Sequence, residues 1–145
     1  MHTVQHILDK KSGPVACIDA NATVLDAAKL MNERRIGALV ITQGEKVIGI
    51  FTERDILNRV VAAQRPAAKT VVKDVMTAPV ACCRRNTTES ECRAVMRSKR
   101  IRHIPVVEDD CLVGIISIGD IIEEETAQKD ETIHFLREYL YGNYR

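Results

Sequence analysis

The sequence GIFTERD at residues 49–55 returns 65 positions later as GIISIGD at residues 114–120, so that the pattern G-x-x-[T/S]-x-x-D occurs twice. Sliding the chain against itself by 65 residues extends this match over more than forty positions without a gap. The sequence PVAC at residues 14–17 falls on PVAC at residues 79–82, and Met31 falls on Met96. An internal repeat of this length predicts two copies of one structural unit.

Each copy is too small to be stable by itself. A unit of about 60 residues buries only a marginal core, so we expect the two repeats to pack together about a pseudo-twofold axis. We assign residues 1–65 to the first repeat, residues 66–125 to the second and residues 126–145 to a C-terminal tail. Upstream of the ungapped match the register shifts by three residues, and the apolar positions 4, 7 and 8 align with positions 72, 75 and 76.

The same order of elements is predicted in both repeats. In the first repeat, apolar strands are expected at 15–18, 38–42 and 46–51, with one helix after the first strand and another that begins at Thr52. In the second repeat, the short apolar run with Cys82 and Cys83 supplies the first strand. Later strands follow at 104–107 and 112–116, and the last helix begins at Ser117. We therefore predict a mixed α/β (α+β) fold of two β-α-β-β-α units.

The first helix of each repeat has a recognisable start. Thr23 with Asp26, and Thr88 with Glu91, have the spacing of a capping box. Apolar residues at helical spacing predict the buried face of each helix. These residues are Leu25, Ala28, Leu30 and Met31 in the first repeat, and Cys92, Val95 and Met96 in the second.

The tail at 126–145 has the pattern of an amphipathic helix, because Ile133, Leu136 and Leu140 recur at helical spacing. It also holds four of the five aromatic rings of the chain: Phe135, Tyr139, Tyr141 and Tyr144. Aromatic residues are enriched at protein interfaces. Packing across a subunit interface and folding back on the same chain both remain open for this tail.

Composition excludes several classes of protein. The chain has 21 basic and 20 acidic side chains, which is not the basic surplus of a nucleic-acid binder. Its longest apolar run, at 36–41, is far shorter than the ~20 residues of a membrane span. No secretory signal is visible. We expect a soluble protein with neither nucleic acid nor membrane as partner, located in the cytoplasm, or in an organelle matrix if a transit peptide has been removed.

The five cysteines do not form a recognisable framework, because their number is odd and no C-x-x-C occurs. Neighbouring residues of a strand point to opposite faces, so Cys82 and Cys83 are read as two small apolar side chains on two sides of one strand. The other reading is a vicinal redox pair, which requires an exposed thiol with a lowered pKa.

The repeated motif has the groups that a ribonucleotide needs. Glycine permits close approach, while the hydroxyl and the helix N-terminus offer donors to an anionic group. Asp55 and Asp120 lie one turn later and can each accept two hydrogen bonds from a vicinal diol. A T-x-x-D sequence is also the ordinary signature of a capped helix. Its recurrence at the same place in both repeats favours the binding site.

Together with RHIPVV at 102–107, the duplicated unit resembles the cystathionine-β-synthase (CBS) domain pair, also called a Bateman module. The resemblance covers roughly residues 4–124 and extends to small stand-alone CBS-pair proteins of bacteria and plant organelles. It implies a regulatory module that binds adenine nucleotides in the cleft between its repeats and often forms a homodimer.

The resemblance also implies two nucleotide sites, each drawing residues from both repeats. The first site would use Ile50, Thr52, Arg54, Asp55, Thr77, Val80, Arg102, His103, Ile104 and Pro105. The second would use Ile115, Ser117 and Asp120 with Val15, Gly37, Ala38 and Leu39.

The two sites differ in charge. Arginine pairs well with phosphate, and Arg102 and His103 of the first site are replaced by Gly37 and Ala38 in the second. We therefore expect a phosphorylated ligand at the Asp55 site. The second site, expected to be roomier and less charged, would take a nucleoside, the far half of a dinucleotide, or nothing.

The sequence thus predicts a sensor of AMP, ADP, ATP or NAD(H) that signals to a separate, unidentified protein by a change in conformation or oligomeric state. No nucleophile or acid/base pair suggests an enzyme, and no cysteine–histidine spacing suggests a metal site. The alternative is a thiol-responsive or structural interaction module whose nucleotide site is vestigial. S-adenosylmethionine or a metal ion in the cleft is a third possibility.

Overall fold

The computed structural model describes residues 2–128, and the predicted tail helix falls mainly outside them. The first repeat forms a three-stranded sheet of β1 (Cys17–Asp19), β2 (Ala38–Gln43) and β3 (Lys46–Thr52) in that order. Strand β1 runs parallel to β2, and β2 pairs antiparallel with β3. Helix α2 (Val24–Arg34) connects β1 to β2. After β3 the short helix α3 (Glu53–Asp55) continues into the π-helix η1 (Ile56–Val61).

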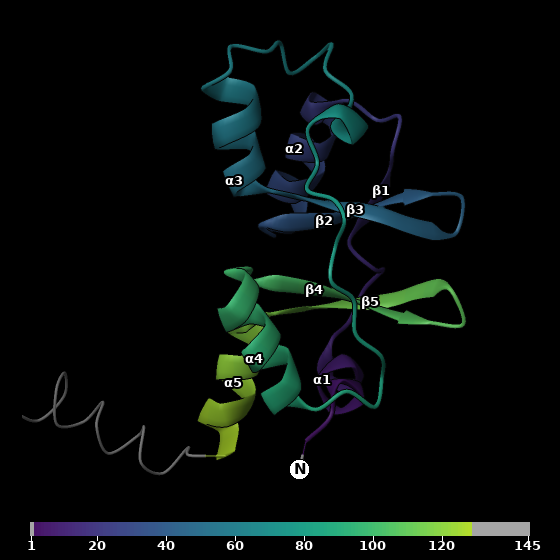
Figure 1. Cartoon of the computed structure of the whole chain (residues 1–145), viewed down its shortest axis with the longest axis vertical. Coiled ribbons are helices and arrows are strands. Elements are labelled where there is room, and N and C mark those ends of the chain that lie inside the picture. Colours follow the sequence, from purple (N-terminus) through teal and green to yellow (C-terminus); the bar gives the residue numbers. More distant parts are fainter. Residues whose placement is uncertain (1, 129–145) are drawn as a thin grey trace, which may run out of the picture.

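The second repeat has the same order of elements with one strand reduced. Helix α4 (Glu89–Lys99) leads into an antiparallel pair of β4 (His103–Glu108) and β5 (Cys111–Ser117), and α5 (Ile118–Gln128) follows. The strand predicted around Cys82 and Cys83 is a single parallel bridge between Cys83 and Val106. The two sheets lie one above the other in the middle of the molecule, with α2 and α3 beyond one and α4 and α5 beyond the other (Figure 1). This is the predicted α/β fold of two β-α-β-β-α units.

The segment that precedes each repeat in the sequence packs on the other repeat. Helix α1 (Val4–Lys10) lies against the second repeat (Figure 1), where the Val4 amide donates to the Thr87 carbonyl. The 3-10 helix η2 (Val72–Asp74) packs on the first repeat, where the Val72 amide donates to the Ala22 carbonyl. The two hydrogen bonds occupy equivalent places in the duplication. The upstream alignment of positions 4 and 72 thus corresponds to an exchange of segments between the repeats.

The two hydrophobic cores are built from equivalent positions of the duplication. Phe51 and Leu39 are fully buried in the first core together with Val72. Ile116 and Ile104 are buried in the second together with Val4. The cores therefore join residues far apart in the sequence.

Both capping boxes form as predicted, at Thr23 and at Thr88. The buried face of α4 contains Cys92 and Met96 as expected, with Val95 packed against them. The buried face of α2 is rotated from the prediction, because Val24 is buried while Leu25 is 37% exposed. The Val24 amide donates a hydrogen bond to the carbonyl of Thr70, which lies just before η2. The start of α2 is therefore covered by the segment that contains η2, and Val24 is buried there.

Candidate functional site

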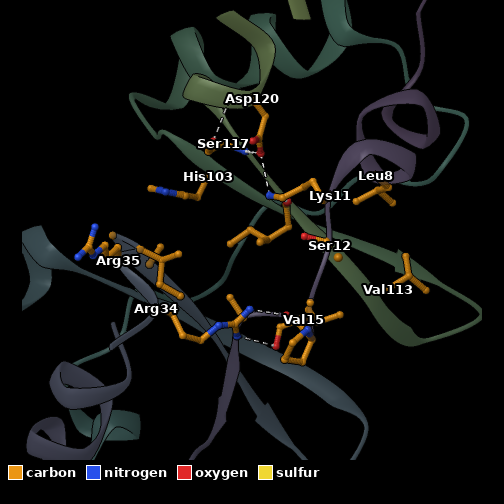
Figure 2. Close-up of a pocket in the computed structure, with 18 residues that line it drawn as sticks. Leu8, Lys11, Ser12, Val15, Arg34, Arg35, His103, Val113, Ser117 and Asp120 are labelled. Atoms are coloured by element: carbon orange, nitrogen blue, oxygen red, sulfur yellow. Dashed lines mark hydrogen bonds and ion pairs between the residues drawn. The ribbon is translucent and has the colours of Figure 1, made fainter. Parts of the chain in front are cut away.

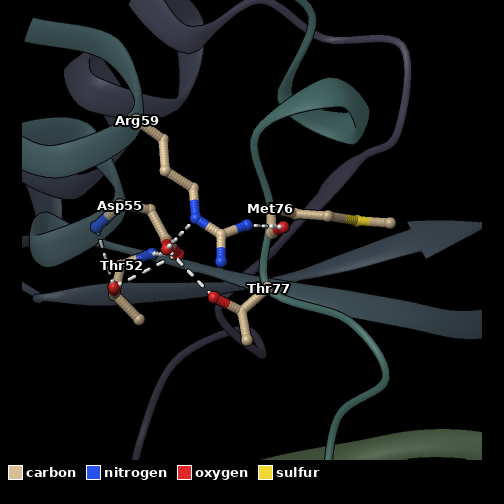
Figure 3. Close-up of polar contacts among 5 residues, drawn as sticks. All are labelled: Thr52, Asp55, Arg59, Met76 and Thr77. Atoms are coloured by element: carbon tan, nitrogen blue, oxygen red, sulfur yellow. Dashed lines mark hydrogen bonds and ion pairs between the residues drawn. The ribbon is translucent and has the colours of Figure 1, made fainter. Parts of the chain in front are cut away.

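Asp55 is the most enclosed acid of the repeated motif, and its side chain is only 7% exposed. Its Oδ2 accepts a hydrogen bond from the Thr52 amide at 3.0 Å, and the Asp55 amide donates to Thr52 Oγ1, which completes a capping box. On the other carboxylate oxygen, Oδ1 accepts from Thr77 Oγ1 at 2.9 Å and lies 3.6 Å from Arg59 Nε (Figure 3). The carboxylate therefore joins β3, η1 and the segment that enters the second repeat.

A cavity of about 630 Å³ opens beside Asp55. Four cationic side chains from the two repeats line it: Arg54, Lys99, Arg100 and Arg102. Within residues 2–128, none of these four side chains has a hydrogen bond or ion pair, whereas Arg59 is held by Asp55 and the Met76 carbonyl. Unpaired cations that converge on one cavity favour an anionic ligand.

Asp120 occupies the equivalent place in the second repeat but has a different partner. Its Oδ2 accepts from the Ser117 amide and from Lys11 Nζ, both at 2.9 Å (Figure 2). Lys11 also donates to the Ile115 carbonyl at 2.8 Å, so its ammonium group replaces the Thr77 hydroxyl of the first site. The Asp120 side chain is 19% exposed. It is the more accessible of the two carboxylates.

The cavity beside Asp120 has a volume of about 530 Å³. It is therefore the smaller cavity, which contradicts the expectation of a roomier site. It is not free of cations either, because Lys11, Arg34 and Arg35 line it. The Arg34 guanidinium donates to the carbonyls of Pro14 and Val15, so two of these three cations already have partners inside the protein.

Most of the predicted site residues line the two cavities. Those in the Asp55 cavity are Ile50, Thr52, Arg54, Asp55, Thr77, Val80, Arg102 and His103. Those in the Asp120 cavity are Val15, Gly37, Ala38, Ile115, Ser117 and Asp120. Gly37 and His103 line both.

Three predicted residues do not line either cavity. Leu39 and Ile104 follow cavity-lining residues directly, and successive residues of a strand point to opposite faces, so both point into the cores. Pro105 is buried along β4, where its carbonyl accepts from the Cys83 amide.

Sequence reasoning missed the residues at the ends of the two central helices. Arg34 and Arg35 line one cavity, and Lys99 and Arg100 line the other. Arg35 and Arg100 have the left-handed backbone of a helix C-cap, with φ of 55° in both. The signal was present, since these pairs of cations recur 65 positions apart.

His103 lies where the two cavities meet. Burial lowers its pKa from the ordinary value, with further lowering by the nearby charges of Lys11 and Arg102 and opposition from Asp120 and Glu53. The imidazole is therefore mainly neutral at pH 7 and faces both sites as a hydrogen-bonding group.

The thiol chemistry of a redox pair is not favoured at Cys82 and Cys83. Burial raises the pKa of Cys82, and a hydrogen bond with Cys92, followed by burial, raises that of Cys83. A reactive cysteine needs the opposite shift. The partner of Cys83 is Cys92 in the second core rather than its neighbour in the sequence.

Two β-α-β-β-α units that exchange their leading segments and border two adjoining cavities define a two-repeat α/β module. The chain belongs to the CBS-domain family, whose profile matches residues 4–62 and again residues 72–126. The resemblance seen in the sequence is thereby confirmed. Proteins of this family are generally regulatory.

Similar proteins come from bacteria, archaea and plants. The chain is 36% identical over 127 residues to a mitochondrial CBS domain-containing protein, CBSX3, of Arabidopsis thaliana, and the match covers 84% of the chain and 62% of that relative. A putative signal-transduction protein with CBS domains from Burkholderia ambifaria has a solved structure that is 38% identical. Its TM-score is 0.83, over 88% of this chain and 96% of that one.

The CBS domain pair of protein MJ0100 has been solved in complex with 5-methylthioadenosine and S-adenosyl-L-methionine. It is 26% identical with a TM-score of 0.78, over 88% of this chain and 98% of that one. CBS pairs thus include binders of adenosine-containing ligands. In the part of the chain that the structure describes, no helix is both long and apolar enough to cross a membrane.

Proposed function

We propose that this protein is a regulatory module that binds a phosphorylated adenosine ligand, AMP, ADP or ATP, in the Asp55 cavity. The observation that carries the proposal is the group of four cations, unpaired within residues 2–128, around a buried carboxylate at the junction of the repeats. In this assignment Asp55 accepts the ribose diol, and Arg102 with its neighbours binds the phosphate.

The Asp120 cavity suits an adenosine ligand with less negative charge. Its carboxylate is more exposed, and Asp120 Oδ1 has no hydrogen bond within residues 2–128, which leaves an acceptor for a diol. Two of its cations are already paired. A nucleoside, or a sulfonium ligand such as the S-adenosyl-L-methionine of the MJ0100 pair, fits this balance. NAD(H) is the other candidate, because Gly37 and His103 border both cavities and a dinucleotide could occupy the two together.

Binding at Asp55 can be transmitted through Thr77. A diol on the carboxylate competes with Thr77 Oγ1 and Arg59 for Asp55 Oδ1. Thr77 belongs to the segment that joins the repeats, and its amide and carbonyl also pair with Ile50. A ligand that displaces Thr77 favours a state in which this segment is released, which is the differential binding that a sensor requires.

The output goes to another copy of the chain or to a regulated partner. Leu57 and Ile122 are equivalent positions of the two repeats, 61% and 55% exposed on η1 and α5, and Val61 is 63% exposed. Large apolar side chains at such positions favour a homodimer through these helices. Substituting glutamate for both Leu57 and Ile122 should shift the sedimentation coefficient to that of a monomer. Cytoplasmic location remains a prediction.

The function is tested by calorimetric titration and thermal shift of the full chain. The ligands are AMP, ADP, ATP, NAD+, NADH, S-adenosylmethionine and 5-methylthioadenosine. A ligand at 100 times its Kd should raise the free energy of unfolding by about 2.7 kcal/mol. Asp55→Asn should abolish the effect of the phosphorylated ligand while keeping a cap on the helix.

The matched control is Asp26→Asn, because Asp26 is also the third residue of a capped helix in the first repeat and lines neither cavity. Equal loss of binding in both variants would assign the effect to helix capping. The absence of binding by every ligand would overturn the proposal.

A further inference from the structure

A cluster of metal-ligating side chains lies outside both cavities, where the start of the described chain meets α5. His2 precedes α1, and His6 follows one turn later with its ring centroid 4.5 Å from that of His2. Glu124 of α5 faces both histidines. The ligand atoms of the three residues all lie within 4.8 Å of one another.

Glu124 is buried, with 5% of its surface exposed, although it is an acid. Its Oε1 is 2.8 Å from His6 Nε2 and 3.8 Å from His2 Nδ1. Its Oε2 accepts from Lys10 Nζ at 2.7 Å. The hydrogen bond from Lys10, supported by His6 and against the effect of burial, lowers the pKa of the Glu124 carboxyl.

We propose that His2, His6 and Glu124 form a binding site for a divalent transition-metal ion of the zinc class. Two imidazoles and one carboxylate oxygen are a ligand set that Zn²⁺ prefers, whereas Mg²⁺ and Ca²⁺ prefer oxygen ligands alone. Three protein ligands leave at least one position open for water or for a group from another molecule.

The two distances from Glu124 to the imidazoles fit this role. Ligand atoms around a tetrahedral zinc ion at about 2.0–2.1 Å lie about 3.3 Å from one another. The separations of 2.8 Å and 3.8 Å from Glu124 Oε1 to the two imidazoles bracket this value. The ion would lie between His6 Nε2 and Glu124 Oε1 and replace their direct contact. Lys10 holds Oε2 and leaves Oε1 for the ion, as an outer-sphere partner does.

Glu89 is a second acid whose backbone contacts this end of the chain, and one of its carboxylate oxygens lacks a partner within residues 2–128. Glu89 Oε1 is buried and accepts no hydrogen bond in the described part of the chain. The Glu89 amide donates to the His2 carbonyl at 3.0 Å, so this residue is attached to the same end of the chain. A buried carboxylate oxygen without a donor is compensated by a nearby cation.

The duplication does not repeat this site. Position 59 of the first repeat corresponds to Glu124 and holds Arg59, which pairs with Asp55. With the three-residue shift of the upstream alignment, Thr70 and Asp74 correspond to His2 and His6. A bound ion would fasten α1 to α5 beside Lys11, the residue that reaches Asp120. The inference rests on this cluster and does not depend on the proposed nucleotide site.

The test uses the full chain freed of metal with a chelator. Titration with Zn²⁺ against a chromophoric competitor should give one ion per chain, with no comparable binding of Mg²⁺ or Ca²⁺. His6→Ala and His2→Ala should each weaken Zn²⁺ binding by at least about 100-fold, because removal of a ligand costs no less than removal of an outer-sphere partner, which costs about 10–100-fold. The control is His103→Ala, which removes an imidazole that faces the cavities and should leave the Zn²⁺ affinity unchanged.

Co²⁺ provides a readout of the ligands themselves. Its absorption spectrum should lack thiolate-to-cobalt charge transfer, because no cysteine belongs to the cluster. Thiolate bands would assign the metal to the cysteines, and equal Zn²⁺ affinity in His6→Ala and the parent would place it away from His6. Either result would overturn the proposal. Circular dichroism of each variant establishes that it is folded. A folded parent chain that binds no Zn²⁺ also overturns it.

Discussion

The Asp55 and Asp120 cavities come from the same duplicated motif, yet they present different chemistry. Around Asp55, four cations are unpaired within residues 2–128 and the carboxylate is held by hydroxyls and Arg59. Around Asp120, Lys11 forms an ion pair with the carboxylate, and Arg34 donates hydrogen bonds to backbone carbonyls. Both sites have the same capped helix start, while a few side chains set the charge that is available to a ligand.

Those positions can be read from the duplication. Gly37 stands where the second repeat has Arg102, and Gly119 stands where the first has Arg54. Each replacement leaves the Asp120 cavity with one cation fewer. Duplication followed by substitution at the cavity edge is therefore sufficient to give two cavities of different charge.

The largest expected effect comes from removing the charge that distinguishes the cavities. The double substitution Lys99→Ala with Arg102→Ala should weaken binding of the phosphorylated adenosine ligand by about 100-fold, since a hydrogen bond to a charged group contributes roughly 1.5–3 kcal/mol. Isothermal titration calorimetry measures this change. Binding of an uncharged adenosine ligand should remain within about twofold.

The control for this pair is Arg84→Ala with Arg97→Ala, which removes the same charge from exposed positions that line neither cavity. A comparable loss in the control would mean that overall charge, rather than the cavity edge, attracts the ligand.

The next effect compares equivalent glycines on the central strands. A Cβ at Gly49 would lie 2.5 Å from Met76 Sδ and 2.9 Å from the Thr77 carbonyl oxygen, which is backbone. A Cβ at Gly114 would lie 2.5 Å from Leu8 Cδ2, the end of a flexible side chain. Gly49→Ala should lower the free energy of unfolding by about 2–3 kcal/mol, and Gly114→Ala by about 1 kcal/mol. Urea denaturation measures both, and equal losses would contradict the rigid contact at Thr77.

Ionic strength should separate the cavities by a smaller factor. Raising NaCl from about 0.05 M to about 0.5 M shortens the Debye length several-fold. The Kd of the phosphorylated ligand should rise by about tenfold, whereas that of an uncharged adenosine ligand should change by less than about twofold. Titrations at the two salt concentrations test this, and a parallel response of both ligands would contradict the charge difference.

The smallest effect concerns His103 at the junction of the cavities. Burial lowers its pKa in the folded protein, so the unfolded chain binds more protons once the pH falls towards the ordinary value of 6.5. The free energy of unfolding therefore falls as the pH drops through 6.5 towards the lowered pKa of His103, because the imidazole is protonated first in the unfolded chain. His103→Gln should flatten the dependence of unfolding free energy on pH in this interval. An unchanged slope in urea titrations would mean that other groups cause it.

The sequence predicted the fold through its repeat and its capping signals. Thr52 and Ser117 were identified as starts of helices, and both bond the aspartate three residues later. The first strand of the second repeat was overestimated, because an apolar run such as 79–83 does not reveal that only Cys83 finds a partner strand. Local sequence carries pattern, whereas pairing depends on contacts far along the chain.

The same limit applies to the candidate sites. The repeated aspartates were predicted from the motif, and Arg102 and His103 from the resemblance to the CBS pair. Lys11 was not, since its place on Asp120 requires α1 to cross to the second repeat. The pairing of Arg34 with carbonyls of the segment before β1 was likewise invisible. These long-range contacts decide which cations remain available to a ligand.

The exchanged leading segments bear on how the chain is made. Helix α1 leaves the ribosome before the other described elements, but its buried side chains pack with β4, β5 and α5. Its Lys10 reaches Glu124, 114 positions later. Closing so long a loop is slow compared with forming local structure. During synthesis α1 must therefore wait, without its partners, until nearly all of the described chain has emerged, and Val4 and Ile7 are exposed to chaperones for that time.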